Sequence, residues 1–144
     1  MGTKSSVEQL NSFLRGETSA VETYQQAIDK LEAFSTSRDQ LLVNLKSHQD
    51  RVMMLRDAII QLGGTPAEGS GPWGAFAKVV EGGAKAFGEK AAVAALEEGE
   101  DHGLADYKRG LDDLDPESRT LVMSKLLPEQ ELTHKRLSNV KHRM

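Results

Sequence analysis

The stretch LNSFLRGETSAVETYQQAIDKL, residues 10–31, carries an apolar or aromatic side chain at every third or fourth position. This spacing is typical of one face of a packed helix. The pattern returns 83 residues later in VAALEEGEDHGLADYKRGLDDL, residues 93–114. In both copies a glutamate, Glu17 or Glu100, takes a position on the apolar face, with glycine before it and tyrosine seven residues after it. A bare carboxylate is costly in an apolar core, so each needs a proton, a cation or a metal as its partner.

Composition places broad limits on the chain. Its 144 residues predict a single domain, residues 1–144, that is large enough to bury a core. The net charge of −4 argues against a nucleic-acid partner. No apolar run is long enough to span a membrane, and no signal peptide is evident at the N-terminus. The absence of cysteine is consistent with a reducing compartment. We therefore expect a cytoplasmic protein that binds neither nucleic acid nor membranes.

The helical periodicity predicts an all-α protein. We expect helices over residues 6–34, 37–62, 89–113 and 115–142, with Pro128 kinking or splitting the last one. The first two are joined by a short link and so should form an antiparallel hairpin, as should the last two. The glycine-rich connection between the hairpins, residues 63–88, is long enough to cross the whole bundle and contains a candidate short helix around Trp73 and Phe76. One long crossover is a feature of ferritin-like bundles.

Polar residues on the predicted inward faces form a candidate metal site. His48 lies on the apolar face of the second helix, and Glu97 lies one turn before Glu100 on the third. Glu131 and His134 are three residues apart on the fourth helix, so they project from one face. Antiparallel pairing would bring these side chains to similar heights. Carboxylates with two imidazoles suit iron or manganese. The candidate ligands are Glu17, His48, Glu97, Glu100, Glu131 and His134.

In this layout the chain resembles the ferritin-like superfamily, and rubrerythrin-type domains in particular. Their ligands are Glu on the first helix, Glu-x-x-His on the second, Glu-x-x-Glu on the third and Glu-x-x-His on the fourth. The sequence also resembles a bacterial four-helix-bundle branch of unassigned function. The shared features are Leu-Gly-Gly-x-Pro at residues 62–66 and the two Gly-Glu-x6-Tyr motifs. The resemblance implies a ferritin-like fold that binds one or two iron or manganese ions.

One position departs from that layout. The second helix has Leu45 where Glu-x-x-His requires a glutamate before His48. One bridging carboxylate is therefore missing from a two-metal site, and a single ion held by Glu100, Glu131 and His134, with or without Glu17, is an equal candidate. The resemblance alone does not establish oxidase or peroxidase chemistry.

Three functional hypotheses remain open from the sequence, of which the third is a partner-binding protein that uses the glycine-rich crossover, residues 63–88, as its contact. The first is a metal-binding protein acting in oxidative stress or iron handling, whose enzymatic form would be a di-metal oxidase or peroxidase. The second is a metal-free helical bundle, a structural or interaction module in which histidines and carboxylates satisfy one another inside the core. Tyr24 and Tyr107 are expected in the core, and a hydrogen bond to a ligand carboxylate is an alternative role for them. Met53 and Met54 are candidates for packing or for homodimer contacts.

Overall fold

The computed structural model describes residues 3–31, 36–71 and 88–144 as a bundle of four long helical rods. The rods are α1 (Thr3–Lys30), α2 (Thr36–Gln61), α4 (Glu89–Gly110) and a fourth built from α5 (Pro116–Leu121), η3 (Val122–Leu126) and α6 (Leu127–Arg143). A 3-10 turn, η2 (Leu111–Asp113), extends α4. The all-α four-helix bundle predicted from the sequence is confirmed. The short helix expected around Trp73 and Phe76 falls outside the described residues.

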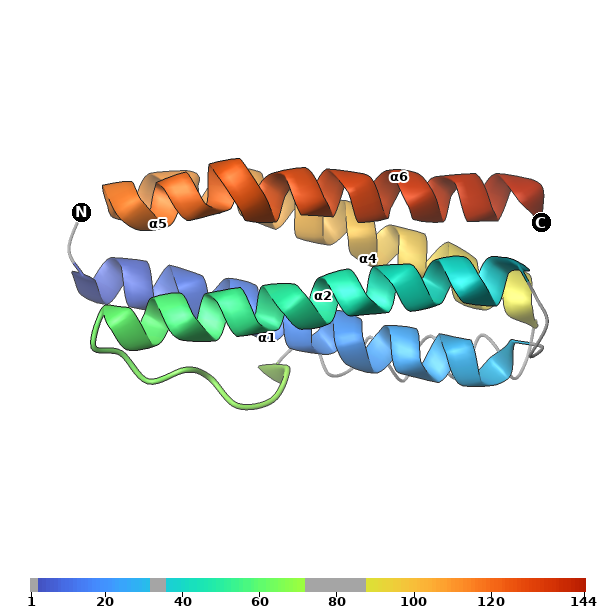
Figure 1. The fold of residues 1–144 in the computed structure, drawn as a ribbon, viewed down its shortest axis with the longest axis horizontal. Coiled ribbons are helices and arrows are strands. Elements are labelled where there is room, and N and C mark those ends of the chain that lie inside the picture. The colour runs from blue at the N-terminus through green and yellow to red at the C-terminus, as the bar shows by residue number, and fades with distance from the viewer. Residues whose placement is uncertain (1–2, 32–35, 72–87) are drawn as a thin grey trace.

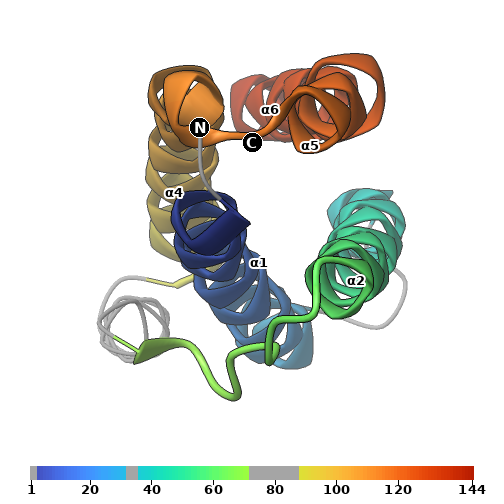
Figure 2. The ribbon, with the colours of Figure 1, turned by 90° about the vertical axis from the view of Figure 1, so that its left-hand side faces the viewer.

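The rods are arranged as two hairpins packed against each other. α1 packs on α2, α4 packs on α6, and the hairpins meet where α1 contacts α4 and α2 contacts α6. The view along the axis shows the four rods around a common centre (Figure 2). Among the described residues, no helix is both long and apolar enough to cross a membrane.

Local sequence signals account for the helix ends. α2 stops just before Gly63, whose φ of 81° is a conformation that glycine adopts without strain. The amide of Gly64 then donates to the carbonyl of Ile59 over 2.9 Å, which satisfies one of the last helical carbonyls. The fourth rod begins at Asp115, whose carboxylate accepts from the Ser118 amide, followed by Pro116 at the first helical position. The expected start of this helix is thus confirmed.

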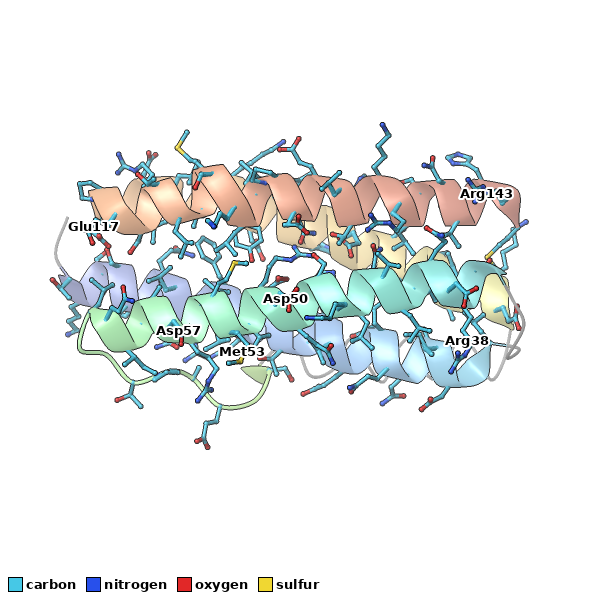
Figure 3. The ribbon with its side chains drawn as sticks, in the orientation of Figure 1. Arg38, Asp50, Met53, Asp57, Glu117 and Arg143 are labelled. Carbon is cyan, nitrogen blue, oxygen red and sulfur yellow. The ribbon has the colours of Figure 1, made fainter. Side chains whose placement is uncertain are left out.

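Pro128 splits the fourth rod without breaking it. The five residues of η3, just before the proline, form a π-helical segment between α5 and α6. Glu117 and Arg143 lie near opposite ends of this rod, which Figure 3 shows as one continuous helix. Proline lacks a backbone N–H and crowds the preceding turn, and a π turn, with its extra residue, accommodates that crowding. The extra residue also changes which side chains point inward further along the rod.

The apolar core is in two parts. One cluster contains Tyr24, Leu41, Val93 and Leu137, and the other contains Phe13, Leu55, Tyr107 and Leu126 among their members. Buried polar or charged residues lie on the inward faces between them, and those at most 4% exposed include Glu17, His48, Arg51, Glu100, Gln130 and Thr133. This polar layer is the candidate functional site.

Candidate functional site

His48 is the centre of the polar layer and joins the two matched glutamates. Its Nδ1 lies 3.0 Å from Glu17 Oε1, and its Nε2 lies 2.7 Å from Glu100 Oε2. All three side chains are at most 4% exposed. A carboxylate beside each ring nitrogen favours the imidazolium, which donates from both, whereas Arg51 Nη2, 3.2 Å from Nε2, opposes it. The two glutamates of the repeated motif are therefore bridged by one histidine.

Arg51 is the second cation of the layer, and its side chain is fully buried. Its Nε lies 3.0 Å from Glu17 Oε2, its Nη2 donates to Thr133 Oγ1 over 3.0 Å, and its Nη1 donates to Gln130 Oε1. Buried arginines are rare unless paired, and this one has a partner at each of its nitrogens. With His48 protonated, two cations balance the two carboxylates and the layer is neutral.

Glu100, in the polar layer, has hydrogen-bond partners at both of its carboxylate oxygens. Its Oε2 accepts from Tyr24 Oη over 2.5 Å, in addition to the contact with His48. Its Oε1 accepts from Gln130 Nε2 over 2.9 Å and from Thr133 Oγ1 over 2.8 Å. A carboxylate with this many donors is held as the anion. Tyr24 thus makes the hydrogen bond to a candidate ligand carboxylate that the sequence offered as its alternative role.

The charges in the polar layer raise the pKa of His48 and lower the pKa of Glu100. Burial alone would lower the pKa of His48, but the carboxylates of Glu17 and Glu100 more than offset it, and the pKa is raised above 6.5. Burial would raise the pKa of Glu100, but His48, Tyr24 and Arg51 stabilise its anion and the pKa falls below 4.5. Both shifts favour the charged forms.

We predict a pH dependence from these shifts. A raised folded-state pKa means that His48 contributes full stability below pH 6.5, and the contribution is lost as pH rises through the raised pKa. A lowered pKa means that Glu100 contributes above pH 4.5 and that this contribution is lost as pH falls through the lowered value. Urea unfolding between pH 3 and 10 should give the two groups' largest combined contribution at pH 4.5–6.5. His48→Gln should remove the alkaline loss; a parallel loss in both proteins would contradict this assignment.

Three of the six predicted ligands lie together and three do not. Glu17, His48 and Glu100 meet in the polar layer, as described above. Glu97 instead accepts from Ser138 Oγ and from Lys141 Nζ, each over 2.8 Å. Hydrogen bonding to Lys141 and Ser138 lowers the Glu97 pKa. This glutamate therefore serves as a link between α4 and the end of α6.

Glu131 and His134 do not face the centre. Glu131 is exposed, and His134 Nε2 contacts the carboxylate of Asp101 on α4, with 28% and 64% of the two side chains exposed. The inward positions of α6 are instead Gln130 and Thr133, one residue earlier in each case. One residue is about 100° around a helix. The expected Glu-x-x-His motif is intact in the sequence, but it lies on a different side of the helix.

The π segment accounts for this difference in phase. Buried residues recur at every fourth position along the fourth rod, through Ser118, Val122, Leu126 and Gln130. In an uninterrupted α-helix, which has 3.6 residues per turn, side chains four positions apart would point in progressively different directions. The wider π turn takes up the drift and brings Gln130 to the centre. The inward position of Gln130 could therefore not be predicted from residue spacing alone.

Sequence reasoning missed Arg51, Gln130 and Thr133, together with Asn44. A signal was present on α2, where Asn44, His48 and Arg51 follow the same 4-3 spacing as the apolar face that includes Leu41 and Leu55. Apolar spacing predicts instead that the neighbouring face through Leu45 and Val52 is inward, but both of those residues are only partly buried. The layer is therefore built from polar residues that an apolar pattern search passes over.

The two halves of the layer correspond to each other in sequence. Glu17 and Glu100 are 83 residues apart, and the inward pairs His48–Arg51 and Gln130–Thr133 are 82 apart. Each pair has the i, i+3 spacing of a Glu-x-x-His motif and projects inward, as the metal ligands of a di-iron carboxylate bundle do. His48-x-x-Arg51 and Gln130-x-x-Thr133 thus share the spacing and the inward direction of Glu-x-x-His motifs, but not their ligand atoms.

These residues do not fit a di-metal centre in the arrangement described. Arg51, a permanent cation with no ligand atom, lies among the glutamates, and both nitrogens of His48 are directed at carboxylates. Gln130 and Thr133 are neutral where bridging carboxylate and imidazole would be needed. No group of three or more acidic, histidine or cysteine side chains in the described part of the chain is arranged to hold a metal ion.

Comparison with known proteins identifies the fold and the family. A solved structure described as "Crystal structure of ferritin like, diiron-carboxylate proteins from Bacillus anthracis str. Ames" matches with a TM-score of 0.76 and 17% identity, over 98% of this chain and 99% of that one. At this identity the match shows the fold, which is ferritin-like. No curated protein matches the sequence. Residues 5–113, more than half of the chain, match a family described as a domain of unknown function, DUF2383. The protein is therefore a member of the DUF2383 family, with the fold of a ferritin-like four-helix bundle.

Proposed function

We propose that this protein is a ferritin-like structural or interaction module in which a buried ionic network takes the place of a metal centre. The observation that carries the proposal is Arg51, a fully buried guanidinium 3.0 Å from Glu17 Oε2 with further partners on α2 and α6. A metal ion in a carboxylate bundle neutralises converging carboxylates and ties the helices together. Arg51 and His48 supply both effects from the chain itself.

The network joins all four rods. Glu17 lies on α1, His48 and Arg51 on α2, Glu100 on α4, and Gln130 and Thr133 on α6. A misregistered packing of any rod would leave at least one buried charge without its partner, which is strongly unfavourable. The role we assign to the network is thus to specify a single helix register.

An outward face of α2 supports the interaction role. Large apolar side chains that are well exposed occur there, including Met53 at 59% and Ile60 at 57% (Figure 3 labels Met53). Leu42 and Val43 are exposed on the same helix, about three turns before Met53. Leu42, Met53 and Ile60 are spaced 11 and 7 residues apart, which places them on one side of the helix, as in a helix that packs against a partner.

A second candidate function is metal binding, with iron or manganese and a role in oxidative stress or iron handling. It is favoured by the convergence of Glu17, His48 and Glu100, and by the diiron-carboxylate description of the similar structure. For an ion to bind there, Arg51 would have to move away from Glu17, and His48 would have to give up one carboxylate. The enzymatic form of this candidate, a di-metal oxidase or peroxidase, would require the same movements of Arg51 and His48 before metal could bind.

Thermal unfolding with metal ions separates the two candidates. We expect an unchanged melting temperature when chelator-treated protein is given anaerobic Fe²⁺, Mn²⁺ or Zn²⁺, because an ion without a native site cannot stabilise the native state. Binding at a hundred times its Kd would add about 2.7 kcal/mol, which corresponds to a rise of roughly 5–10 °C for a chain of this size. Such a rise, together with one or two ions per chain retained after desalting, would favour the metal-binding candidate.

A further inference from the structure

α2 presents apolar side chains on two opposite sides. Its inward side contributes three fully buried side chains to the core: Leu41, Leu55 and Ile59. Its outward side carries four large apolar side chains that are 38–59% exposed: Leu42, Val43, Met53 and Ile60. In the described ranges of the chain, neither α1 nor α4 exposes a large apolar side chain to this extent. A helix that is apolar on all sides is typically a buried helix, so we expect a partner on the outward side of α2.

The exposed residues in line with Leu42 form a single stripe along α2. We name it the outer stripe and define it as Leu42, Lys46, Gln49, Met53, Asp57 and Ile60, all of which are exposed. They follow one another at intervals of three or four residues, so they share one side of the helix. Figure 3 labels Met53 and Asp57 on this stretch of α2. At 1.5 Å per residue the stripe is about 27 Å long, which is more than half the length of α2.

The outer stripe is symmetric about its centre. Leu42 lies nine residues before position 51 and Ile60 lies nine residues after it, while Gln49 and Met53 lie two residues before and after. A second copy of α2 running antiparallel therefore brings Leu42 opposite Ile60 and Met53 opposite Gln49. A twofold axis at the centre repeats each contact. The exposed apolar side chains are then covered by side chains that the chain itself supplies.

The charges of the stripe match in the same arrangement. Lys46 lies five residues before the centre and Asp57 lies six residues after it, toward the same edge of the stripe. A twofold axis perpendicular to both helices keeps this edge on the same side in the two copies, so Lys46 of one copy lies opposite Asp57 of the other. Within one chain Lys46 pairs with Asp50, whereas Asp57 forms no ion pair with another described residue. The second copy thus provides Asp57 with a counter-charge.

Other partners fit the outer stripe less well than a second antiparallel copy. A parallel copy would place Lys46 opposite Lys46, and like charges repel. The stripe and its edges hold two cations, Lys46 and Arg56, and two acids, Asp50 and Asp57. They carry no net charge with which to attract a strongly basic or acidic partner. Bringing two such stripes together adds no net charge to the interface.

We propose that the outer stripe binds the outer stripe of a second copy, which makes the protein a homodimer with two antiparallel α2 helices at its interface. Leu42, Met53 and Ile60 supply the apolar burial, and the paired Lys46 and Asp57 set the direction of the helices. The inference rests on the interaction role proposed above and names its partner. The polar layer lies on the opposite side of α2, so self-association and metal binding are measured independently and can fail separately.

Sedimentation equilibrium of the full chain at pH 7 tests the dimer. We expect a mass of twice 15.8 kDa. Met53→Glu places a carboxylate beside the twofold axis in each copy and should weaken dimerisation at least tenfold. Met123→Glu is the matched control, because Met123 is 56% exposed, against 59% for Met53, and lies on the fourth rod, outside the outer stripe. It should leave dimerisation unchanged.

An exchange of charges tests the direction of the helices. Lys46→Glu and Asp57→Lys each set like charges against one another and should each weaken self-association roughly tenfold. In an equimolar mixture the carboxylate introduced at position 46 of one variant faces the ammonium introduced at position 57 of the other, and the second pair keeps its natural charges. The mixture should therefore form a heterodimer as stable as the natural dimer. Both positions are exposed, so the helical circular dichroism spectrum should stay unchanged.

The proposal would be overturned by a natural chain that sediments as a monomer up to about 1 mM, a concentration at which even weak complexes form. A dimer that Met53→Glu leaves intact, or that Met123→Glu disrupts as strongly, would overturn it as well. So would a mixture of the two charge variants that associates no better than either variant alone. A monomeric natural chain that also retains no metal would leave the ionic network in place and remove only the partner assigned to α2.

Discussion

Arg51→Met should lower the free energy of unfolding by about 3–5 kcal/mol, because it leaves buried carboxylates without one of their two cations. Methionine keeps much of the side-chain volume, so the loss reports the missing charge and hydrogen bonds rather than a large cavity. Glu17 would lose its partner at Oε2, and Gln130 and Thr133 would each lose a donor. Urea unfolding at pH 6, where His48 remains charged, is the measurement.

Two control variants test whether the loss of stability comes from the uncompensated buried charge. Arg109→Met removes an arginine whose side chain is 73% exposed and which pairs with Asp106 on the same helix, so it should change stability by no more than about 0.5 kcal/mol. Adding Glu17→Gln to Arg51→Met should recover part of the loss, since the uncompensated carboxylate is then gone. A loss below about 1 kcal/mol for Arg51→Met would show that the guanidinium does not hold the layer together.

The second large effect is expected from a variant that places metal ligands at the inward positions. His48→Glu, Arg51→His, Gln130→Glu and Thr133→His together create Glu-x-x-His on α2 and α6, opposite Glu17 and Glu100. This is the ligand set of a di-iron carboxylate bundle. The metal-free variant should be less stable than the natural chain, because four carboxylates then repel one another.

Metal ions should restore the stability of this variant. At a hundred times the Kd, each independent site would add about 2.7 kcal/mol, measured as the rise in melting temperature with anaerobic Fe²⁺ or Zn²⁺. The matched control adds Glu131→Gln and His134→Gln, which should leave metal binding unchanged because both side chains lie outside the layer. Loss of metal in that control would mean that Glu131 and His134, rather than Gln130 and Thr133, hold the ligand positions.

Most of the fold could be predicted from local patterns. The repeated apolar faces identified four helices, and Gly63 and Asp115-Pro116 marked two of their ends, because these signals act within a few residues of the chain. The first helix begins at Thr3 and ends at Lys30, a few residues earlier at each end than the spacing indicated. Helix ends depend on weak local preferences, so such differences are common.

The candidate site could be predicted only in part. Glu17, His48 and Glu100 were found because each interrupts an apolar face within a single helix. Arg51 was missed because an arginine is normally assumed to be at the surface, and nothing within α2 reveals that Glu17 on another helix will accept its charge.

The sequence by itself determined the helices, the hairpin pairing and the two glutamates of the repeat, since these follow from periodicity along the chain. Only the tertiary structure decided which polar residues meet. The π segment before Pro128 turns Gln130 and Thr133 inward and Glu131 and His134 outward. A buried arginine is tolerated only where the packing of separate helices surrounds it with acceptors. A shift of one residue in helical phase is too small to see in a pattern of apolar spacing, yet at the centre of this bundle it decides whether Glu131 and His134 or Gln130 and Thr133 face the polar layer.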